Sequence, residues 1–296
     1  MVGFPRDRLS RLALGTAQLG MDYGVVAPSR APDDGAARAI LDAAWDSGIT
    51  CFDTARLYGD AEARIGAWRA ATGHAPLVIT KIGKRDNATA VEDDLASSMA
   101  ALGVTCLDGV LAHRAEDLRA PGVAAALREA VDTGRLGAFG ASVYEPDAAA
   151  RALAVPGVTL LQAPLSVFDR RLVESGVLAR AAAGGVAVFA RSVFLQGLLL
   201  ADPARLPAFF EPAAPALHRF RAIAGAAHMS SAALALASVL AEDGVASVVI
   251  GVTDADEMRA NAQAAGQNVD PAAIAEARAA GQGLPLAMID PRQWPT

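Results

Sequence analysis

The feature that most constrains the fold of this chain is an alternation between short apolar runs and longer Ala-rich segments with helical periodicity. Eight runs have the length and composition of buried strands: Leu12–Gly15, Ile49–Asp53, Leu77–Lys81, Leu107–His113, Leu136–Ser142, Leu160–Ala163, Val186–Arg191 and Ser247–Gly251. Runs of this kind, separated by amphipathic helices, are typical of parallel strands joined by helical crossovers. Eight such units predict an α/β protein with a (β/α)8 TIM barrel, whose active site lies at the carboxyl ends of the strands.

Helix start and stop signals separate these runs. Asp33 begins one helical segment that Gly48 ends, and Pro146 begins another that ends before Pro156. One longer excursion, Leu198–Pro215, is rich in Pro and Phe and is predicted to be a loop over one mouth of the barrel. No interdomain linker is legible, so residues 1–296 are expected to form a single domain.

Composition and charge argue against several classes of protein. Hydrophobic residues make up 53% of the chain and aromatic residues 5%, which suits the aliphatic layers of a barrel interior. The formal net charge of -6 comes without any block of Lys or Arg, so neither nucleic acid nor an anionic membrane is an expected partner. Residues 1–10 hold no hydrophobic signal core, and no apolar stretch reaches the roughly 20 residues of a membrane span. Cytoplasmic residence is therefore expected.

The cysteines and most histidines show no spacing typical of a metal or redox site. Cys51 and Cys106 lie far apart in the sequence and are expected to be reduced, buried thiols. Three histidines are expected to be packed or solvent-facing, and not metal ligands: His74, His218 and His228. No metal is predicted.

Polar residues follow the apolar runs at or near their carboxyl ends. They are Asp53, Lys81, His113, Ser142, Gln162, Ser192 and Thr253. A single polar residue at a strand end usually does no more than meet solvent. Because these strand ends converge on one face of a barrel, seven of them together predict a functional site there.

Some of these positions lie in motifs that resemble the aldo-keto reductase family. The motifs are Phe52-Asp53-Thr54-Ala55-Arg56-Leu57-Tyr58-Gly59 followed by Glu62 and Gly66, then Thr80-Lys81, then Leu111-Ala112-His113, in the family's order and spacing. The likeness extends from Leu12 to Asn261 and so covers most of the chain. It implies a barrel enzyme that reduces an aldehyde or ketone, a small-molecule carbonyl substrate, with hydride from a nicotinamide cofactor.

The resemblance implies a catalytic tetrad of Asp53, Tyr58, Lys81 and His113. An isolated tyrosine, with an ordinary pKa of about 10, is a poor proton donor at neutral pH unless a cation lies close to it. Lys81 would supply that cation, and Asp53 would hold the ammonium in place. His113 would orient the carbonyl, so that Tyr58 protonates its oxygen while hydride reaches its carbon.

The cofactor implied by the resemblance is NADP(H) or NAD(H), bound on the barrel mouth. The absence of a G-x-G-x-x-G fingerprint argues against a Rossmann fold. The expected cofactor contacts are Gly15, Thr16, Ser142, Gln162, Arg191, Ser192, Phe194, Gln196, Gly251, Thr253, Glu257 and Asn261. Among them Ser142 and Gln162 match the family's contacts to the carboxamide, whereas Val143 and Ser166 stand where the family often has asparagine.

Arg191 stands where the family usually places a tyrosine that stacks on the nicotinamide. A guanidinium can stack on a ring, but a cation beside an oxidised, positively charged nicotinamide is electrostatically unfavourable. Two hypotheses follow: Arg191 turns away to an acid, or it shifts the redox balance toward the reduced cofactor.

The segment from Gly251 to Asn261 resembles the family's clamp for the adenosine phosphate and keeps the asparagine. Where many members carry Arg, Lys or Gln for a 2′-phosphate, this sequence has Thr253, Asp254 and Glu257. Acids repel a phosphate, so a preference for NADP is in question. The alternative is that these acids only cap the following helix.

Two other functions are compatible with the same residues. One is a sugar or hydroxy-acid dehydrogenase that acts oxidatively, and the other is a non-catalytic, cofactor-sensing regulatory subunit. The short loop Arg114–Gly122 suggests an open pocket, and three apolar residues could either line it or pack elsewhere: Phe209, Met288 and Trp294. The sequence gives no indication of oligomeric state.

Overall fold

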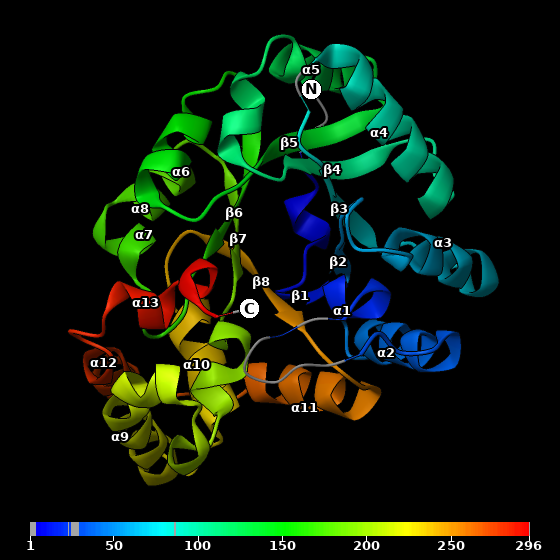
Figure 1. Ribbon diagram of the computed structural model, residues 1–296. Helices are drawn as coiled ribbons and strands as arrows, with labels where there is room; N and C mark the ends of the chain where they lie inside the picture. Colours follow the sequence, from blue (N-terminus) through cyan, green and yellow to red (C-terminus); the bar gives the residue numbers. More distant parts are fainter. Residues whose placement is uncertain (1–3, 23, 25–29, 86, 296) are drawn as a thin grey trace.

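Eight parallel strands close into a barrel in which each strand pairs with its neighbour in chain order and β8 pairs back onto β1 (Figure 1). The computed structural model describes residues 4–22, 24, 30–85 and 87–295. The strands are β1 (Leu12–Gly15), β2 (Cys51–Asp53), β3 (Leu77–Ile82), β4 (Leu107–Ala112), β5 (Leu136–Ser142), β6 (Val158–Pro164), β7 (Ala187–Arg191) and β8 (Val245–Gly251). The predicted (β/α)8 barrel is confirmed.

Helices follow the strands and form an outer layer around the barrel (Figure 1). They are α1 (Ala17–Gly20), α2 (Asp34–Asp46), α3 (Ala61–Thr72), α4 (Ala88–Leu102), α5 (Val123–Asp132), α6 (Pro146–Leu153), α7 (Arg171–Glu174), α8 (Val177–Ala183), α9 (Ala214–Ala226), α10 (Ser231–Leu240), α11 (Ala255–Ala265), α12 (Pro271–Ala280) and α13 (Leu286–Ile289). Short 3-10 turns are η1 (Arg6–Arg8), η2 (Ala115–Arg119), η3 (Leu195–Leu200), η4 (Pro203–Arg205), η5 (Ala208–Ala213) and η6 (Pro291–Gln293). Helices α9 and α12 pack together on the outside of α10.

The predicted helix starts are confirmed by their caps. Asp33 accepts a hydrogen bond from the Ala36 amide at 2.8 Å and begins α2. Pro146 lies in the first turn of α6, where its missing N–H costs no hydrogen bond. The Asp33 cap thus satisfies one free amide of α2, and Pro146 leaves α6 with one free amide fewer, although Glu145 before it makes no side-chain cap.

Strand boundaries differ from prediction by one or two residues, except at Leu12–Gly15 and Leu136–Ser142, which agree with β1 and β5. The largest shortening is in β2, which begins at Cys51 and not at Ile49. The Thr50 amide donates to the Ser10 hydroxyl at 2.9 Å and not to a neighbouring strand, whereas the Thr50 carbonyl still accepts from the Leu77 amide at 2.8 Å. A side chain of the N-terminal segment thus takes one of the backbone groups that the strand ladder would use.

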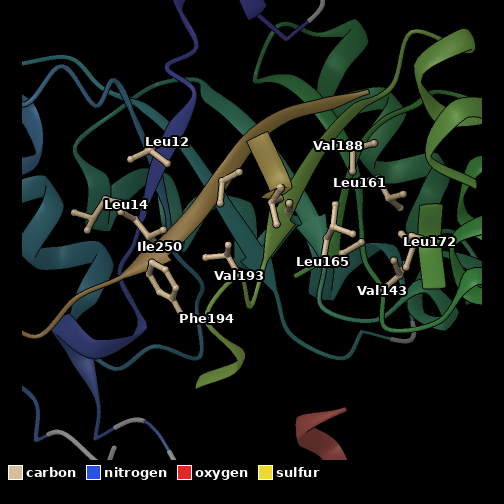
Figure 2. Close-up of a cluster of buried hydrophobic side chains, with 14 of the residues drawn as sticks. Leu12, Leu14, Val143, Leu161, Leu165, Leu172, Val188, Val193, Phe194 and Ile250 are labelled. Atoms are coloured by element: carbon tan, nitrogen blue, oxygen red, sulfur yellow. The ribbon is translucent and has the colours of Figure 1, made fainter. Parts of the chain in front are cut away.

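Two separate apolar layers follow from the alternation of side chains along each strand. In β1, Leu12 and Leu14 belong to the large layer between strands and helices, part of which Figure 2 shows, whereas Ala13 belongs to a small cluster inside the barrel. Phe4 joins this inner cluster and meets Phe189 of β7 edge-to-face, with ring centroids 5.7 Å apart.

The inner cluster sets which residues reach the barrel mouth. Successive side chains on one face of a strand are two residues apart. Six members of the inner cluster are each followed, two residues later, by a residue at a strand end. The cluster members are Cys51, Ile79, Leu111, Leu160, Phe189 and Val249, and the residues that follow them are, in the same order, Asp53, Lys81, His113, Gln162, Arg191 and Gly251. These residues are therefore the next inward-facing layer, at the carboxyl ends of the strands.

The excursion predicted as a loop, Leu198–Pro215, is instead a series of 3-10 turns that leads into α9. Leu198 and Leu199 are buried, and Leu200 is exposed. Within the described residues, no single helix is both long and apolar enough to cross a membrane; one pair bent by 92°, Ala208–Ala226 with Ser231–Leu240, meets the length and composition criteria jointly.

Candidate active site

The most deeply buried charges of the barrel mouth are Lys81 and Asp53. The Lys81 ammonium donates to both carboxylate oxygens of Asp53, at 2.7 and 2.8 Å, and to the Thr54 carbonyl at 3.0 Å. The two residues are 2% and 5% exposed. Burial is the largest single influence and lowers the pKa of Lys81, but the charges of Asp53 and Tyr58 and the hydrogen bonds to them together raise the net pKa above its ordinary value. Lys81 is therefore a permanent cation.

Further hydrogen bonds hold Asp53 in place. The side-chain amide of Gln162, at the end of β6, donates to Asp53 Oδ1 at 2.7 Å. The Thr16 hydroxyl and the Thr16 amide both donate to the backbone carbonyl of Asp53, each at 2.9 Å. These contacts tie Asp53 to β6 through its carboxylate and to the end of β1 through its backbone carbonyl.

Tyr58 lies in the turn between β2 and α3, beside the Lys81 ammonium. The Lys81 Nζ atom lies 5.0 Å from the centroid of the Tyr58 ring. The turn approaches the end of α1 closely: a methyl group added to Gly20 would lie 1.8 Å from the Tyr58 carbonyl oxygen. One added to Gly59, which has φ +52°, would lie 2.1 Å from the Gly20 carbonyl oxygen. Two glycines thus allow the contact that positions Tyr58.

His113 follows β4 and faces the same cavity. Burial, with smaller effects of the cations Lys81 and Arg191, holds the pKa of His113 below its ordinary value of 6.5. Its Nδ1 atom is buried and has no hydrogen-bond partner among the described residues. The imidazole is therefore neutral near pH 7.

One cavity of about 360 Å³ connects these side chains. All four residues predicted as the tetrad line it. So do ten of the predicted cofactor contacts: Gly15, Ser142, Gln162, Arg191, Ser192, Phe194, Gln196, Gly251, Thr253 and Glu257. The sequence motifs therefore converge on one site, drawn from all eight strand ends or the turns after them.

Two predicted cofactor contacts do not line this cavity. Thr16 is fully buried, because its hydroxyl is used to hold the Asp53 carbonyl. Asn261 is 5% exposed on the inner side of α11, and its amide nitrogen has no partner among the described residues. A buried amide without a partner costs free energy unless a ligand group or water satisfies it.

The backbone after β7 is strained where it borders the cavity. The backbone angle φ is +61° at Ser192, +48° at Leu195 and +49° at Gln196. Residues other than glycine rarely adopt such values. Ser192 and Gln196 both line the cavity. Strain of this kind typically gathers at binding sites.

Arg191 lies in the cavity and pairs with no acid among the described residues, so the hypothesis that it turns away to an acid is wrong. Its guanidinium donates to the Val143 carbonyl at 3.0 Å and to the Ser192 hydroxyl at 3.3 Å. The Cζ atom lies 4.1 Å from the centroid of the Tyr144 ring. The partners of Arg191 are thus the Val143 carbonyl, the Ser192 hydroxyl and the Tyr144 ring, and not the carboxylate of that hypothesis.

The acids after β8 do cap the following helix. Asp254 accepts from the Glu257 amide at 2.8 Å at the start of α11. Glu257 in turn accepts from the amide and hydroxyl of Thr253, at 2.7 and 2.9 Å. Because Thr253 and Glu257 also line the cavity, the capping role and a role beside a ligand are compatible.

Sequence reasoning missed several cavity residues, among them Gln18, Met21, Tyr144, Val193 and Leu200. Tyr144 lies two residues after Ser142, just past the end of β5, so the alternation of side chains continued beyond that strand would have indicated it. Met21 and Leu200 are exposed apolar side chains at the cavity, and no motif marks them.

Phe209, Met288 and Trp294, which were expected either to line the pocket or to pack elsewhere, do not line the cavity. Trp294 is 5% exposed, donates its indole N–H to the Ala287 carbonyl at 2.8 Å and meets the Phe210 ring edge-to-face at 4.8 Å. Met288 is buried, and Phe209 packs against Phe210. All three contribute to packing.

The expectation for the cysteines is half wrong. Cys51 is buried in the inner cluster, but Cys106 is exposed, because it precedes β4 on the surface. His74 stacks on Trp45 with ring centroids 4.7 Å apart, as expected of a packed histidine. Among the described residues, no group of three His, Cys, Asp or Glu side chains is placed to hold a metal ion.

A closed (β/α)8 barrel whose polar side chains converge on a cavity at the strand ends is the architecture of TIM-barrel enzymes. The sequence matches the profile of the Aldo/keto reductase family over residues 11–281, and the chain belongs to this family of oxidoreductases. It is 33% identical, over 212 residues, to aldo-keto reductase str7 from Strobilurus tenacellus, an alignment that covers 68% of this chain. The matched part spans 61% of that relative.

Solved structures share the fold at lower sequence identity. Aldo-keto reductase AKR11C1 from Bacillus halodurans, in its holo form, superposes with a TM-score of 0.77 at 23% identity, covering 96% of this chain and 95% of the other. The glycerol dehydrogenase AKR11B4 from Gluconobacter oxydans superposes with a TM-score of 0.75 at 22% identity, covering 97% and 94%. Both likenesses support the barrel fold.

Proposed function

We propose that this chain catalyses the NAD(P)H-dependent reduction of an aldehyde or ketone, with Tyr58 as the proton donor. The observation that carries the proposal is the arrangement of Asp53, Tyr58, Lys81 and His113 around one cavity, with the Lys81 ammonium 5.0 Å from the Tyr58 ring centroid. Membership of a family of oxidoreductases supports the same class of reaction.

The Tyr58 hydroxyl transfers its proton to the oxygen of the substrate carbonyl as the carbon receives hydride. The phenolate left on Tyr58 is stabilised by the Lys81 ammonium, which is held by Asp53 at 2.7 and 2.8 Å. Because Lys81 is buried and paired, its charge is present before the substrate arrives and needs no reorganisation. One hydride and one proton convert the carbonyl to an alcohol.

His113 positions the carbonyl oxygen in this proposal. Its lowered pKa keeps the imidazole neutral, so that it donates a hydrogen bond to the oxygen and leaves the acid role to Tyr58. A neutral imidazole also avoids adding a second cation beside Lys81.

The nicotinamide nucleotide supplies the hydride when it is bound. The chain offers groups that fit such a ligand: Ser142 and Gln162 face the cavity for a carboxamide, and the buried, unpartnered amide of Asn261 suits a heterocyclic acceptor such as adenine. Gly15 and Gly251 also line the cavity.

Stopped-flow measurement of nicotinamide fluorescence tests the proposal. The protein is mixed with NADPH or NADH and a generic aromatic aldehyde, and the loss of reduced nicotinamide is followed with time. We expect hydride transfer with at least one of the two nucleotides. Binding of a nucleotide without any oxidation, across aldehydes and ketones, would contradict the proposal and indicate a cofactor-sensing protein. Turnover of alcohols with NAD alone would indicate an oxidative dehydrogenase.

A further inference from the structure

The one arginine of the cavity lining, Arg191, has no carboxylate partner among the described residues. Its hydrogen bonds go to the Val143 carbonyl and the Ser192 hydroxyl, both neutral groups. A guanidinium carries five N–H donors, so these two bonds leave donors free for a ligand. A half-buried cation without a counter-charge is costly unless an anion completes it.

The guanidinium is held in a fixed orientation. The Tyr144 ring contacts two cations, with Arg191 Cζ 4.1 Å and Arg292 Cζ 4.5 Å from its centroid. Arg292 is anchored in turn by Asp290, which is fully buried, and by Glu145 at 2.8 Å. Stacking on an aromatic face fixes the plane of a guanidinium and reduces the entropy lost when it binds a ligand.

The other charges of the cavity are already neutralised or engaged. Lys81 is paired with Asp53, and Glu257 accepts two hydrogen bonds from Thr253. Arg191 lies near enough to His113 to contribute to the lowering of its pKa, after burial and Lys81. The unpaired cation therefore lines the same cavity as Tyr58 and His113, where the carbonyl is expected to bind.

We propose that Arg191 binds a carboxylate carried by the carbonyl substrate, so that this chain acts on aldehydes or ketones that are also acids. The inference rests on the proposed function and names its substrate class. A planar guanidinium with free donors matches a carboxylate in a two-point contact, which would orient the carbonyl toward Tyr58 and His113. A phosphate of the nucleotide offers similar chemistry, and the experiment separates the two sources.

Two aldehydes of the same size test the proposal: para-formylbenzoate, which carries a carboxylate, and its amide, para-formylbenzamide. The ratio of their kcat/KM values is measured for the wild type, for Arg191→Met and for Arg38→Met. Arg38 lies on α2, is 57% exposed in its side chain and does not line the cavity, so this variant controls for net charge. We expect the wild type and Arg38→Met to prefer the carboxylate by about tenfold or more, and Arg191→Met to lose that preference.

A binding measurement tests whether Arg191 binds a carboxylate without requiring turnover. Para-toluate and para-toluamide, which have no aldehyde or ketone group to reduce, are titrated by calorimetry into protein loaded with the nucleotide that it binds. We expect para-toluate to bind the wild type and Arg38→Met, with about tenfold weaker binding to Arg191→Met. Affinity for the nucleotide itself is measured in parallel.

The outcomes are distinct. An unchanged ratio of kcat/KM in Arg191→Met, with unchanged para-toluate affinity, overturns the proposal. Equal losses with both aldehydes, together with weaker nucleotide binding, assign Arg191 to a nucleotide phosphate and also overturn it. If neither aldehyde is reduced, the proposed function fails, and the para-toluate titration still decides whether Arg191 binds a carboxylate.

Discussion

At the scale of single residues, the Lys81–Asp53 pair is the most consequential contact of the barrel mouth. Both side chains are nearly inaccessible to water and lie within 2.8 Å of each other. Replacing Lys81 by methionine leaves the Asp53 carboxylate buried without its cation. We expect Lys81→Met to lower the free energy of unfolding by about 3–5 kcal/mol, measured by urea denaturation.

The double variant Asp53→Asn/Lys81→Met is the control for this prediction. It removes both charges and keeps an acceptor for the Gln162 amide, so it should be more stable than Lys81→Met alone. A double variant that loses the sum of the two single effects would mean that the charges do not depend on each other.

The titration of His113 is a second prediction at this scale. Burial and the cations Lys81 and Arg191 lower its pKa below 6.5, so the folded protein binds fewer protons here than the unfolded chain. This contribution to stability is complete above pH 6.5 and is lost as pH falls through and below that value. Imidazole NMR spectra, with four histidines to assign, should show the lowered pKa directly.

Arg191→Met should raise the pKa of His113, because one of the lowering cations is removed. The surface variant Arg38→Met should leave it unchanged. A His113 that titrates at or above 6.5 in the wild type would contradict the lowered pKa, and a pKa above 7 would leave the imidazole mostly charged at neutral pH, against the role proposed for it.

At the scale of elements, the contact between α1 and the turn that follows β2 positions Tyr58. Gly20 has no room for a methyl group, which would lie 1.8 Å from the Tyr58 carbonyl oxygen. We expect Gly20→Ala to cost about 1–3 kcal/mol of stability, measured by urea denaturation, and to lower kcat by displacing the Tyr58 turn.

Gly225→Ala on α9 is the matched control, since nothing lies within 4 Å of the added methyl group. It should stabilise the protein by about 0.4–1 kcal/mol and leave kcat unaltered. If Gly20→Ala behaves like Gly225→Ala, the close packing of α1 against the turn does not position Tyr58.

The turn between β8 and α11 carries a prediction about the nucleotide. Glu257 lines the cavity and would repel a 2′-phosphate placed near it. We expect NAD(H) to bind more tightly than NADP(H), and Glu257→Gln to narrow the difference several-fold, because the amide keeps an acceptor for Thr253 without the charge. Dissociation constants from fluorescence titration check this.

Asp256→Asn is the control for Glu257→Gln. Asp256 is an acid of the same helix turn with a side chain that is 95% exposed, and it does not line the cavity. Tighter binding of NADP(H) than NAD(H) by the wild type would contradict the prediction.

At the scale of the whole molecule, the barrel could be predicted because its strands and helices are marked by local sequence signals, such as apolar runs and helix caps. The apolar run Leu136–Ser142 and the cap at Asp33 depend only on nearby residues. The polar strand ends could also be predicted to meet, since closure of the barrel follows from eight parallel units. Tyr58 required the family motif, because it lies in a turn and not on a strand.

Contacts between distant segments that no strand-end pattern or family motif marks could not be predicted. Arg292 reaches Tyr144 from a segment 148 positions away along the chain, and no local pattern indicates that stacking. The same holds for Arg191, whose partners are the Val143 carbonyl and an aromatic face. Thr16 was predicted to contact the cofactor, but tertiary packing directs its hydroxyl to Asp53.

The variant Tyr58→Phe tests the central claim most directly, because it removes one hydroxyl group and leaves the ring beside Lys81. Single-turnover reduction of an aldehyde by the bound reduced nucleotide is compared in the two proteins, with nucleotide affinity and thermal unfolding measured alongside. We predict that turnover falls by a factor of about 100 or more while affinity and unfolding temperature stay close to wild type. Turnover in Tyr58→Phe at a rate near that of the wild type would contradict the assignment of Tyr58 as the proton donor.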